Sequence, residues 1–239
     1  WDVLVQCSAQ GSIFCLSDFL LNVHDSRPRL WRCLKGGETK AALMVMESED
    51  GRSCISVDHV IHTGILLMPP QTPQSVAQTI AEDFRITTFV AEELARRYDR
   101  VFVSTHPSFP DIRPFLWHNY GTSEPKFEVT VRYTSVVSLE GVASGTPLDQ
   151  NPAYVNASKS RRQEVRYGIR KGVKTVIEQD VDTFLEFYRL TFARQDESMD
   201  AHYFKRLRSL VEGLLAAGKA SMYLSRTTGG DPGSIEVIG

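Results

Sequence analysis

The amino-acid sequence predicts an α+β protein built from two halves, and three observations support this fold class. Strand patterns and amphipathic helix patterns occur in both halves of the 239 residues. Residues 141–152, which are rich in Gly, Pro, Ser and Asn, have the composition of a connection. The contents of 42% hydrophobic and 23% charged residues are close to globular averages. We therefore expect domains over residues 1–140 and 153–239, joined by a linker over 141–152.

A β-hairpin is the clearest element of the first half. Residues 30–35 and 41–46 are apolar runs that flank Gly36-Gly37-Glu38, which suits a tight turn between antiparallel strands. The other elements expected here, in chain order, are a short helix through 19–21 capped by Ser12 or Ser17, a buried strand over 64–67, a strand over 100–105, a short helix over 113–119 and an alternating strand over 127–139.

A long helix is expected between residues 72 and 98. Thr72 can act as its N-cap, and Pro73 suits the first helical position. Its apolar side chains are expected to share one side that faces the core, and they are Val76, Ile80, Phe84, Ala91 and Leu94.

The second half alternates between helices and strands. The expected elements are a helix over 154–170 that stops at Gly172, a strand over 173–177, a helix that Asp180 caps, a helix from about Phe204 to Gly218, and strands over 221–225 and 234–238. The glycine-rich residues 228–233 suit the turn of a hairpin better than a phosphate cradle. Because the sequence stops at Gly239 in an expected strand, we expect further native sequence beyond it.

Composition excludes several classes of protein. No apolar run approaches the ~20 residues of a membrane span. The four cysteines, at spacings of 8, 18 and 21 residues, fit neither a metal motif nor a redox motif. So few cysteines in a chain of this size also argue against a disulfide framework. We expect reduced thiols, a cytoplasmic location and no metal site.

The most unusual feature of the sequence is a basic stretch over residues 158–174. It holds seven Lys and Arg residues against one acid, Glu164, for a local charge of +6, whereas the whole chain carries −2 and the remainder therefore −8. Cations gathered on one element of an otherwise acidic protein indicate an anionic partner, such as a phosphate, a nucleotide or RNA.

Four of these cations share one helix face because they lie three or four residues apart, and they are Lys159, Arg162, Arg166 and Arg170. A planar guanidinium matches phosphate better than an ammonium does, so the three arginines are the expected phosphate ligands. The alternative is a solvated charged face with no ligand. Val165 and Ile169 lie beside this face and are expected to anchor the helix to a sheet.

Polar and aromatic side chains concentrate between residues 106 and 120, directly after an expected strand, where functional sites are common. Asp111 and His106 are the expected catalytic residues, since either could take a proton from an ammonium group. The expected substrate-binding residues are Trp117, Tyr120, Tyr133 and Arg113. The alternative is structural: Trp117 and Phe115 in the core, Asp111 as a helix cap and His106 as a satisfied polar residue.

Four segments of the chain, taken together and in order, resemble a known family. They are residues 1–14 with Trp1, Ser8 and Gly11; residues 106–120 with His106, Asp111, Arg113, Trp117 and Tyr120; residues 131–139; and residues 160–194 with Glu164, Arg166, Arg170, Asp182, Thr191 and Arg194. The pattern is similar to the Fem-type branch of the GNAT acyltransferases, which includes the aminoacyltransferases that build peptidoglycan bridges. The resemblance implies two GNAT-like lobes of mixed sheets flanked by helices, here with the second lobe cut before its usual end.

The resemblance also implies an activity, namely transfer of an acyl or aminoacyl group to an amine with formation of an amide bond. Such a transfer needs a positioned donor and a stabilised oxyanion rather than a covalent nucleophile. The expected donor is acetyl-CoA, another acyl-CoA or aminoacyl-tRNA, with no permanently bound cofactor, and the expected acceptor bears phosphate or sugar. A glycine-rich turn that opens a helix, the usual coenzyme A signature of the GNAT fold, is missing from the sequence. The alternatives are a CoA-dependent N-acetyltransferase and a non-catalytic module that binds an anionic partner. Because the cations are confined to one helix, a small anion or a tRNA end is favoured and DNA is not expected.

Overall fold

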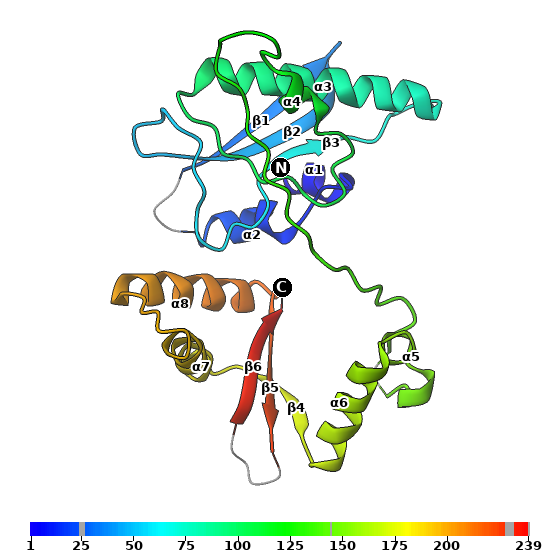
Figure 1. Ribbon diagram of the computed structural model, residues 1–239, viewed down its shortest axis with the longest axis vertical. Coiled ribbons are helices and arrows are strands. Elements are labelled where there is room, and N and C mark those ends of the chain that lie inside the picture. Colours follow the sequence, from blue (N-terminus) through cyan, green and yellow to red (C-terminus); the bar gives the residue numbers. More distant parts are fainter. Residues whose placement is uncertain (24–26, 144, 228–231, 239) are drawn as a thin grey trace. The chain divides into compact units, whose positions relative to one another are not determined.

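The structure is a computed structural model that describes residues 1–23, 27–143 and 145–227, together with the backbone of residues 232–238. The chain divides into two compact units, Trp1–Val131 and Arg132–Gly239. In the described residues each unit holds helices and a three-stranded antiparallel sheet (Figure 1). The α+β class predicted from the sequence is therefore confirmed, but the sheets of the described residues are antiparallel and not mixed as the resemblance implied. The expected domain ends at residues 140 and 153 stay predictions.

The sheet of the first unit is built on the predicted hairpin. Strand β1 (Arg27–Lys35) pairs antiparallel with β2 (Glu38–Glu47), which in turn pairs with β3 (Gly64–Leu67). The turn between β1 and β2 needs two residues with positive φ, and Gly36 (59°) and Gly37 (82°) supply them without a steric penalty.

Strand β2 is the centre of the first unit, because residues 41–47 are all buried. One face, with Leu43 and Val45, packs against the helix α3 (Val76–Arg97) and the short helix α4 (Arg113–Trp117). Figure 1 shows the N-terminal helices α1 (Asp2–Cys7) and α2 (Ser17–Leu20) on the opposite face of this sheet, with a 3-10 turn over Ile13–Cys15 between them. A continuous apolar run is what a strand covered on both faces requires.

Helix α3 begins later than the sequence predicts. Its N-cap is Ser75, which forms a capping box with Gln78, so the expected cap at Thr72 is wrong. The expected core face is also partly wrong. Ala91 and Leu94 are buried, but Val76 is 77% and Ile80 51% exposed.

Two strands expected in the first half are not strands in the structure. Residues 101–105 are extended and only partly paired, through bonds such as Phe102 N–H to the Cys54 carbonyl and Thr63 N–H to the Ser104 carbonyl. Residues 127–139 form no strand either, and residues 128–139 are exposed throughout. No backbone hydrogen bond joins residues 127–138 to another described residue.

The sheet of the second unit follows the order β4 (Lys174–Glu178), β5 (Ser221–Arg226) and β6 (Pro232–Ile238). Helices α7 (Val181–Ala193) and α8 (Ala201–Ala216) pack beside this sheet (Figure 1). Strand β5 alternates as its sequence predicts: Met222 and Leu224 are fully buried and Tyr223 is 37% exposed. The expected hairpin between β5 and β6 is confirmed by their pairing, while its turn residues 228–231 lie outside the described residues.

The helix expected over 154–170 is broken into two. A 3-10 turn (Leu148–Gln150) leads into α5 (Pro152–Val155), and α6 (Lys159–Arg170) begins anew at its N-cap Ser158. Helix α6 holds no buried residue, and Val165 (43%) and Ile169 (60%) are too exposed to anchor it to the sheet as expected.

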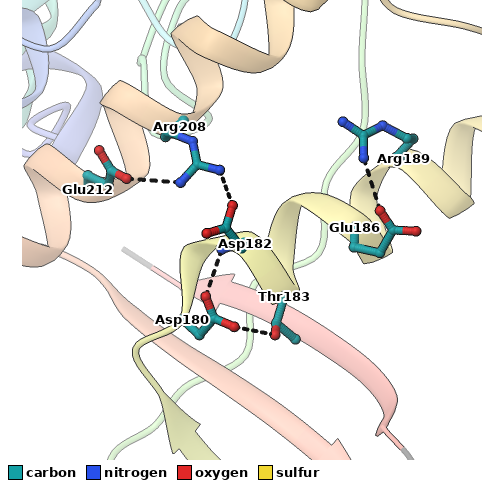
Figure 2. Close-up of polar contacts among 7 residues, drawn as sticks. All are labelled: Asp180, Asp182, Thr183, Glu186, Arg189, Arg208 and Glu212. Carbon is teal, nitrogen blue, oxygen red and sulfur yellow. Dashed lines mark hydrogen bonds and ion pairs between the residues drawn. The ribbon is translucent and has the colours of Figure 1, made fainter.

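Helices α7 and α8 are joined by a polar network on their outer side (Figure 2). The Asp180 side chain caps α7 by accepting from the Asp182 N–H (3.0 Å), which confirms the predicted cap. The Arg208 guanidinium bridges the helices by contacting Asp182 on α7 and Glu212 on α8. The apolar side of the same helices forms the core of the unit with Phe184, Phe204 and Met222.

Candidate functional site

Asp111 and Arg113 form a bidentate ion pair at the start of α4. Arg113 Nε lies 2.9 and 3.0 Å from the two carboxylate oxygens, and its Nη2 lies 2.5 Å from Oδ2. The Arg113 backbone N–H also donates to Asp111 Oδ1 at 2.9 Å. The Asp111 side chain is only 13% exposed, and its hydrogen bonds from Arg113 lower its pKa. Asp111 is therefore a weaker base than an ordinary carboxylate, and it fixes the orientation of Arg113.

The Arg113 guanidinium rests on two aromatic rings. Its Cζ lies 5.5 Å from the centroid of Phe84 on α3 and 5.5 Å from that of Trp117 on α4. The two rings lie 5.6 Å apart, and Trp117 is 55% exposed. The structure therefore brings Asp111, Arg113 and Trp117 together as an aromatic and cationic cluster, which is an arrangement that can stack on and orient a planar or apolar group.

His106 contacts another histidine, His62, and not the three residues of that cluster among the described residues. Its Nδ1 lies 3.1 Å from the Ser108 backbone nitrogen and 2.8 Å from Ser108 Oγ. The ring of His62 lies 5.2 Å away, and burial together with the nearby His106 lowers the pKa of His62. His62 Nδ1 is buried and finds no hydrogen-bond acceptor or donor among the described residues.

The two remaining aromatic candidates are highly exposed. Tyr120 is 80% exposed just after α4, and Tyr133 is 93% exposed in the extended segment 127–139. Neither has a ring contact with another described residue. Their role in a site stays a prediction.

The three candidate arginines of α6 differ in the contacts that their side chains make. Arg162 Nη1 donates to the Val155 carbonyl at 3.2 Å, and Arg170 Cζ lies 4.6 Å above the ring of Tyr167. Arg166 makes no hydrogen bond or ion pair with any residue that the structure describes. Arg166 and Arg170 are exposed and Arg162 is half-buried, so the guanidinium groups of Arg166 and Arg170 are the more open to an anion from solution.

Two residues of these clusters were not candidates in the sequence. Phe84, which the sequence predicts in the core, supports Arg113, and His62 is half-buried beside His106. The available signal for Phe84 is the repeat of four residues that runs through Val76, Ile80 and Phe84. A repeat of four drifts around a helix of 3.6 residues per turn, so these side chains leave the core face.

No group of three or more His, Cys, Asp or Glu side chains is arranged to hold a metal ion in the described part of the chain. No helix within those same residues has the length and apolar character that crossing a membrane requires.

Comparison with known proteins identifies the fold. No protein-family model matches the sequence, and no curated protein matches it either. Among solved structures the likeness is to the Fem-type, GNAT-like fold. One such structure is the crystal structure of FemX, with a TM-score of 0.51 over 95% of this chain at 12% identity. The chain spans about half of that protein, since the match covers 55% of the FemX chain. The fold is therefore FemX-like, as the sequence resemblance implied.

Proposed function

We propose that the protein transfers an acyl or aminoacyl group to an amine and so forms an amide bond. The observation that carries this proposal is the FemX-like fold, which extends over 95% of the chain. The cluster of Asp111, Arg113 and Trp117 supports it, because this cluster offers a fixed guanidinium beside an exposed aromatic ring. A positioned donor and acceptor account for much of the rate of such a transfer.

Each group in the site has a role in this proposal. Arg113, held by Asp111, orients a carbonyl or carboxylate of the acceptor, and Trp117 stacks on its apolar part. His106 is the second candidate for proton transfer, and it acts through Nε2, because Ser108 contacts its Nδ1. Because the pKa of Asp111 is lowered, we propose that it acts on the acceptor amine through water or leaves that proton to solvent. Arg162, Arg166 and Arg170 bind a phosphate of the acceptor or the donor.

The test is a transfer assay read by mass spectrometry. The protein is incubated with acetyl-CoA or with aminoacylated tRNA, each with a nucleotide-linked peptidoglycan precursor as acceptor. We expect a mass gain on the acceptor, a loss of at least tenfold in rate for Arg113→Gln, and a smaller loss for Trp117→Ala. Arg52→Gln, which changes an exposed ion pair in the same unit, is the matched control. Turnover that is unchanged in Arg113→Gln would remove the cluster from the mechanism.

A second function, a non-catalytic module that binds an anion, is favoured by one observation. Arg166 and Arg170 on α6 are exposed, and Arg166 has no partner among the described residues, whereas Asp111 pairs with Arg113 and His106 contacts Ser108. This function predicts binding of bulk tRNA or of a nucleotide diphosphate that weakens with salt, without any transfer. The paired variant Arg166→Gln, Arg170→Gln should weaken that binding without changing the melting temperature.

A further inference from the structure

A surface depression of about 450 Å³ lies where α4 meets the N-terminal part of α3. It is lined by Ala77, Ile80, Ala81, Phe84 and Arg85 of α3 and by Arg113 of α4. Figure 1 shows the two helices side by side in the first unit. Its volume falls in the range of about 300 to 1,000 Å³ that is common for small-ligand sites.

The shape of the depression follows from the sequence of α3. Ala77 and Ala81 stand one turn apart, and their methyl side chains leave a hollow between the larger Ile80 and Phe84. The floor is therefore apolar. Ile80 is 51% exposed, so it leaves a large apolar surface open to solvent at this floor.

Two arginines, Arg85 and Arg113, lie at the rim of the depression. Arg113 is neutralised by its bidentate pair with Asp111, whereas Arg85 makes no ion pair or hydrogen bond with any described residue. No acidic residue lines the depression. The rim thus carries one uncompensated positive charge beside an apolar floor. A monoanion balances that charge, while a phosphate dianion would exceed it.

We propose that this depression binds an apolar group that carries a carboxylate, which is the chemistry of a peptide ending in an apolar residue. The apolar side chain occupies the hollow over Ala77 and Ala81. The carboxylate lies at Arg85, within reach of Nη1 of Arg113. Nη1 has no acceptor among the described residues, because Asp111 binds Nε and Nη2. The inference rests on the proposed function only in that Arg113 also belongs to the proposed acceptor site.

Three probes separate the elements of the proposal, with binding measured by isothermal titration calorimetry at low salt. N-acetyl-alanyl-leucine with a free carboxylate is expected to bind, and its C-terminal amide is expected to bind about fivefold more weakly, the upper range for an exposed ion pair. 4-Methylpentanoate tests whether a simple apolar carboxylate suffices. Equal affinity for acid and amide overturns the assignment of the carboxylate. Failure of both acids to bind at 10 mM, on the order of the weakest affinities that define a site, overturns the site.

Two variants test the location of the site. Arg85→Gln should lower affinity for the acid to that of the amide, and Ala81→Leu should abolish binding by filling the hollow. Arg96→Gln, at the other end of the same helix, is the control and should bind as the parent does. Because Arg85 has no described partner, Arg85→Gln leaves the fold intact, and an unchanged affinity in this variant overturns the proposal.

The result is distinguishable from a failure of the proposed function. If the protein binds the peptide acid but transfers no acyl group, the binding site is supported and the proposed transferase activity is rejected. If Ala81→Leu transfers the acyl group at the normal rate, the transferase activity is supported, and the depression is rejected as the place where the acceptor binds.

Discussion

The middle strands of the two sheets differ in how many of their faces are covered. In the first unit β2 is buried on both faces, with Met44 and Val45 each fully buried. In the second unit β5 buries Met222 and Leu224 but leaves Tyr223 37% exposed, and its neighbour Ile177 on β4 is 65% exposed. Within the described residues, the first unit therefore has a sheet between two layers, and the second has a sheet covered on one face.

This difference predicts where the free energy of folding resides. A side chain in the centre of a doubly covered strand loses both transfer energy and packing when it is truncated. A side chain on an uncovered face has little to lose. The first unit should therefore be the more sensitive of the two to substitutions in its sheet.

The largest expected effect is that of Met44→Ala in β2. Met44 is fully buried, so the substitution should lower the free energy of unfolding by about 2–5 kcal/mol. Ile177→Ala on β4 is the matched change in the second unit and should cost less than about 1 kcal/mol, because Ile177 is 65% exposed. Urea denaturation, with hydrogen exchange to assign the loss to a unit, measures both. Equal losses in the two variants would contradict the comparison.

The next effect concerns two glycines, one in each unit. A Cβ at Gly11 would lie 1.9 Å from the Val5 carbonyl oxygen, so Gly11→Ala must shift backbone and should cost about 1–3 kcal/mol. A Cβ at Gly168, inside α6, meets nothing closer than Val173 at 4.0 Å. Gly168→Ala should therefore stabilise by about 0.5–1 kcal/mol through helix propensity. Thermal melts should show a lower melting temperature for Gly11→Ala and a higher one for Gly168→Ala. A change in the same direction for both variants would be inconsistent with these contacts.

Alkaline pH should affect the first unit before the second. Burial raises the pKa of Cys54 to about 12, and burial and a hydrogen bond to Glu47 also raise the pKa of Tyr98. The folded state then keeps protons that the unfolded state releases above about pH 9, so the free energy of unfolding falls as pH rises from about 9 to 12. The second half of the sequence contains no cysteine.

Alkylation and denaturation can both check this pH dependence. With iodoacetamide at pH 9, Cys7, which is exposed, should react while Cys54 stays unmodified in the folded protein. The urea midpoint of the first unit should fall between pH 9 and 11, and less so in Cys54→Ala. A midpoint that is constant over this range would argue against the buried thiol.

The smallest expected effect lies on the outer side of α7 and α8. Arg208→Ala removes the contacts with Asp182 and Glu212 shown in Figure 2, but all three side chains are at least 37% exposed. Exposed ion pairs contribute less than about 1 kcal/mol, so the melting temperature should change little. A loss as large as that of Met44→Ala would mean that this network, and not the sheet, holds the second unit together.

Local patterns in the sequence predicted most elements, and elements that need distant partners were missed. Gly36 and Gly37 identified the hairpin, and Asp180 identified the start of α7, because a turn or cap depends on adjacent residues. Residues 127–139 alternate as a strand should, but a strand also needs a neighbouring edge with which to pair. No described residue offers one to this segment.

The residues of the candidate site that are close in sequence were predictable, and the one that is distant in sequence was not. Asp111, Arg113 and Trp117 lie within seven residues, so a short window found them, and helix α4 brings them together. Phe84 comes from a helix distant in sequence, and its contact with Arg113 depends on how α3 and α4 pack. The sequence also could not show that Arg113 neutralises Asp111, because that requires the side-chain geometry.

The extended segment 127–139 has a practical consequence for handling the protein. It crosses the boundary between the two units, and Arg132 within it is an exposed cleavage site for trypsin. Limited digestion should therefore cut here first and release two fragments. The same segment contains Val136-Val137-Ser138-Leu139, an uncharged and β-prone sequence that is exposed in the folded chain. Such sequences associate into intermolecular sheets, so precipitation at high concentration should begin at this segment, and a lysine at Val137 should delay it.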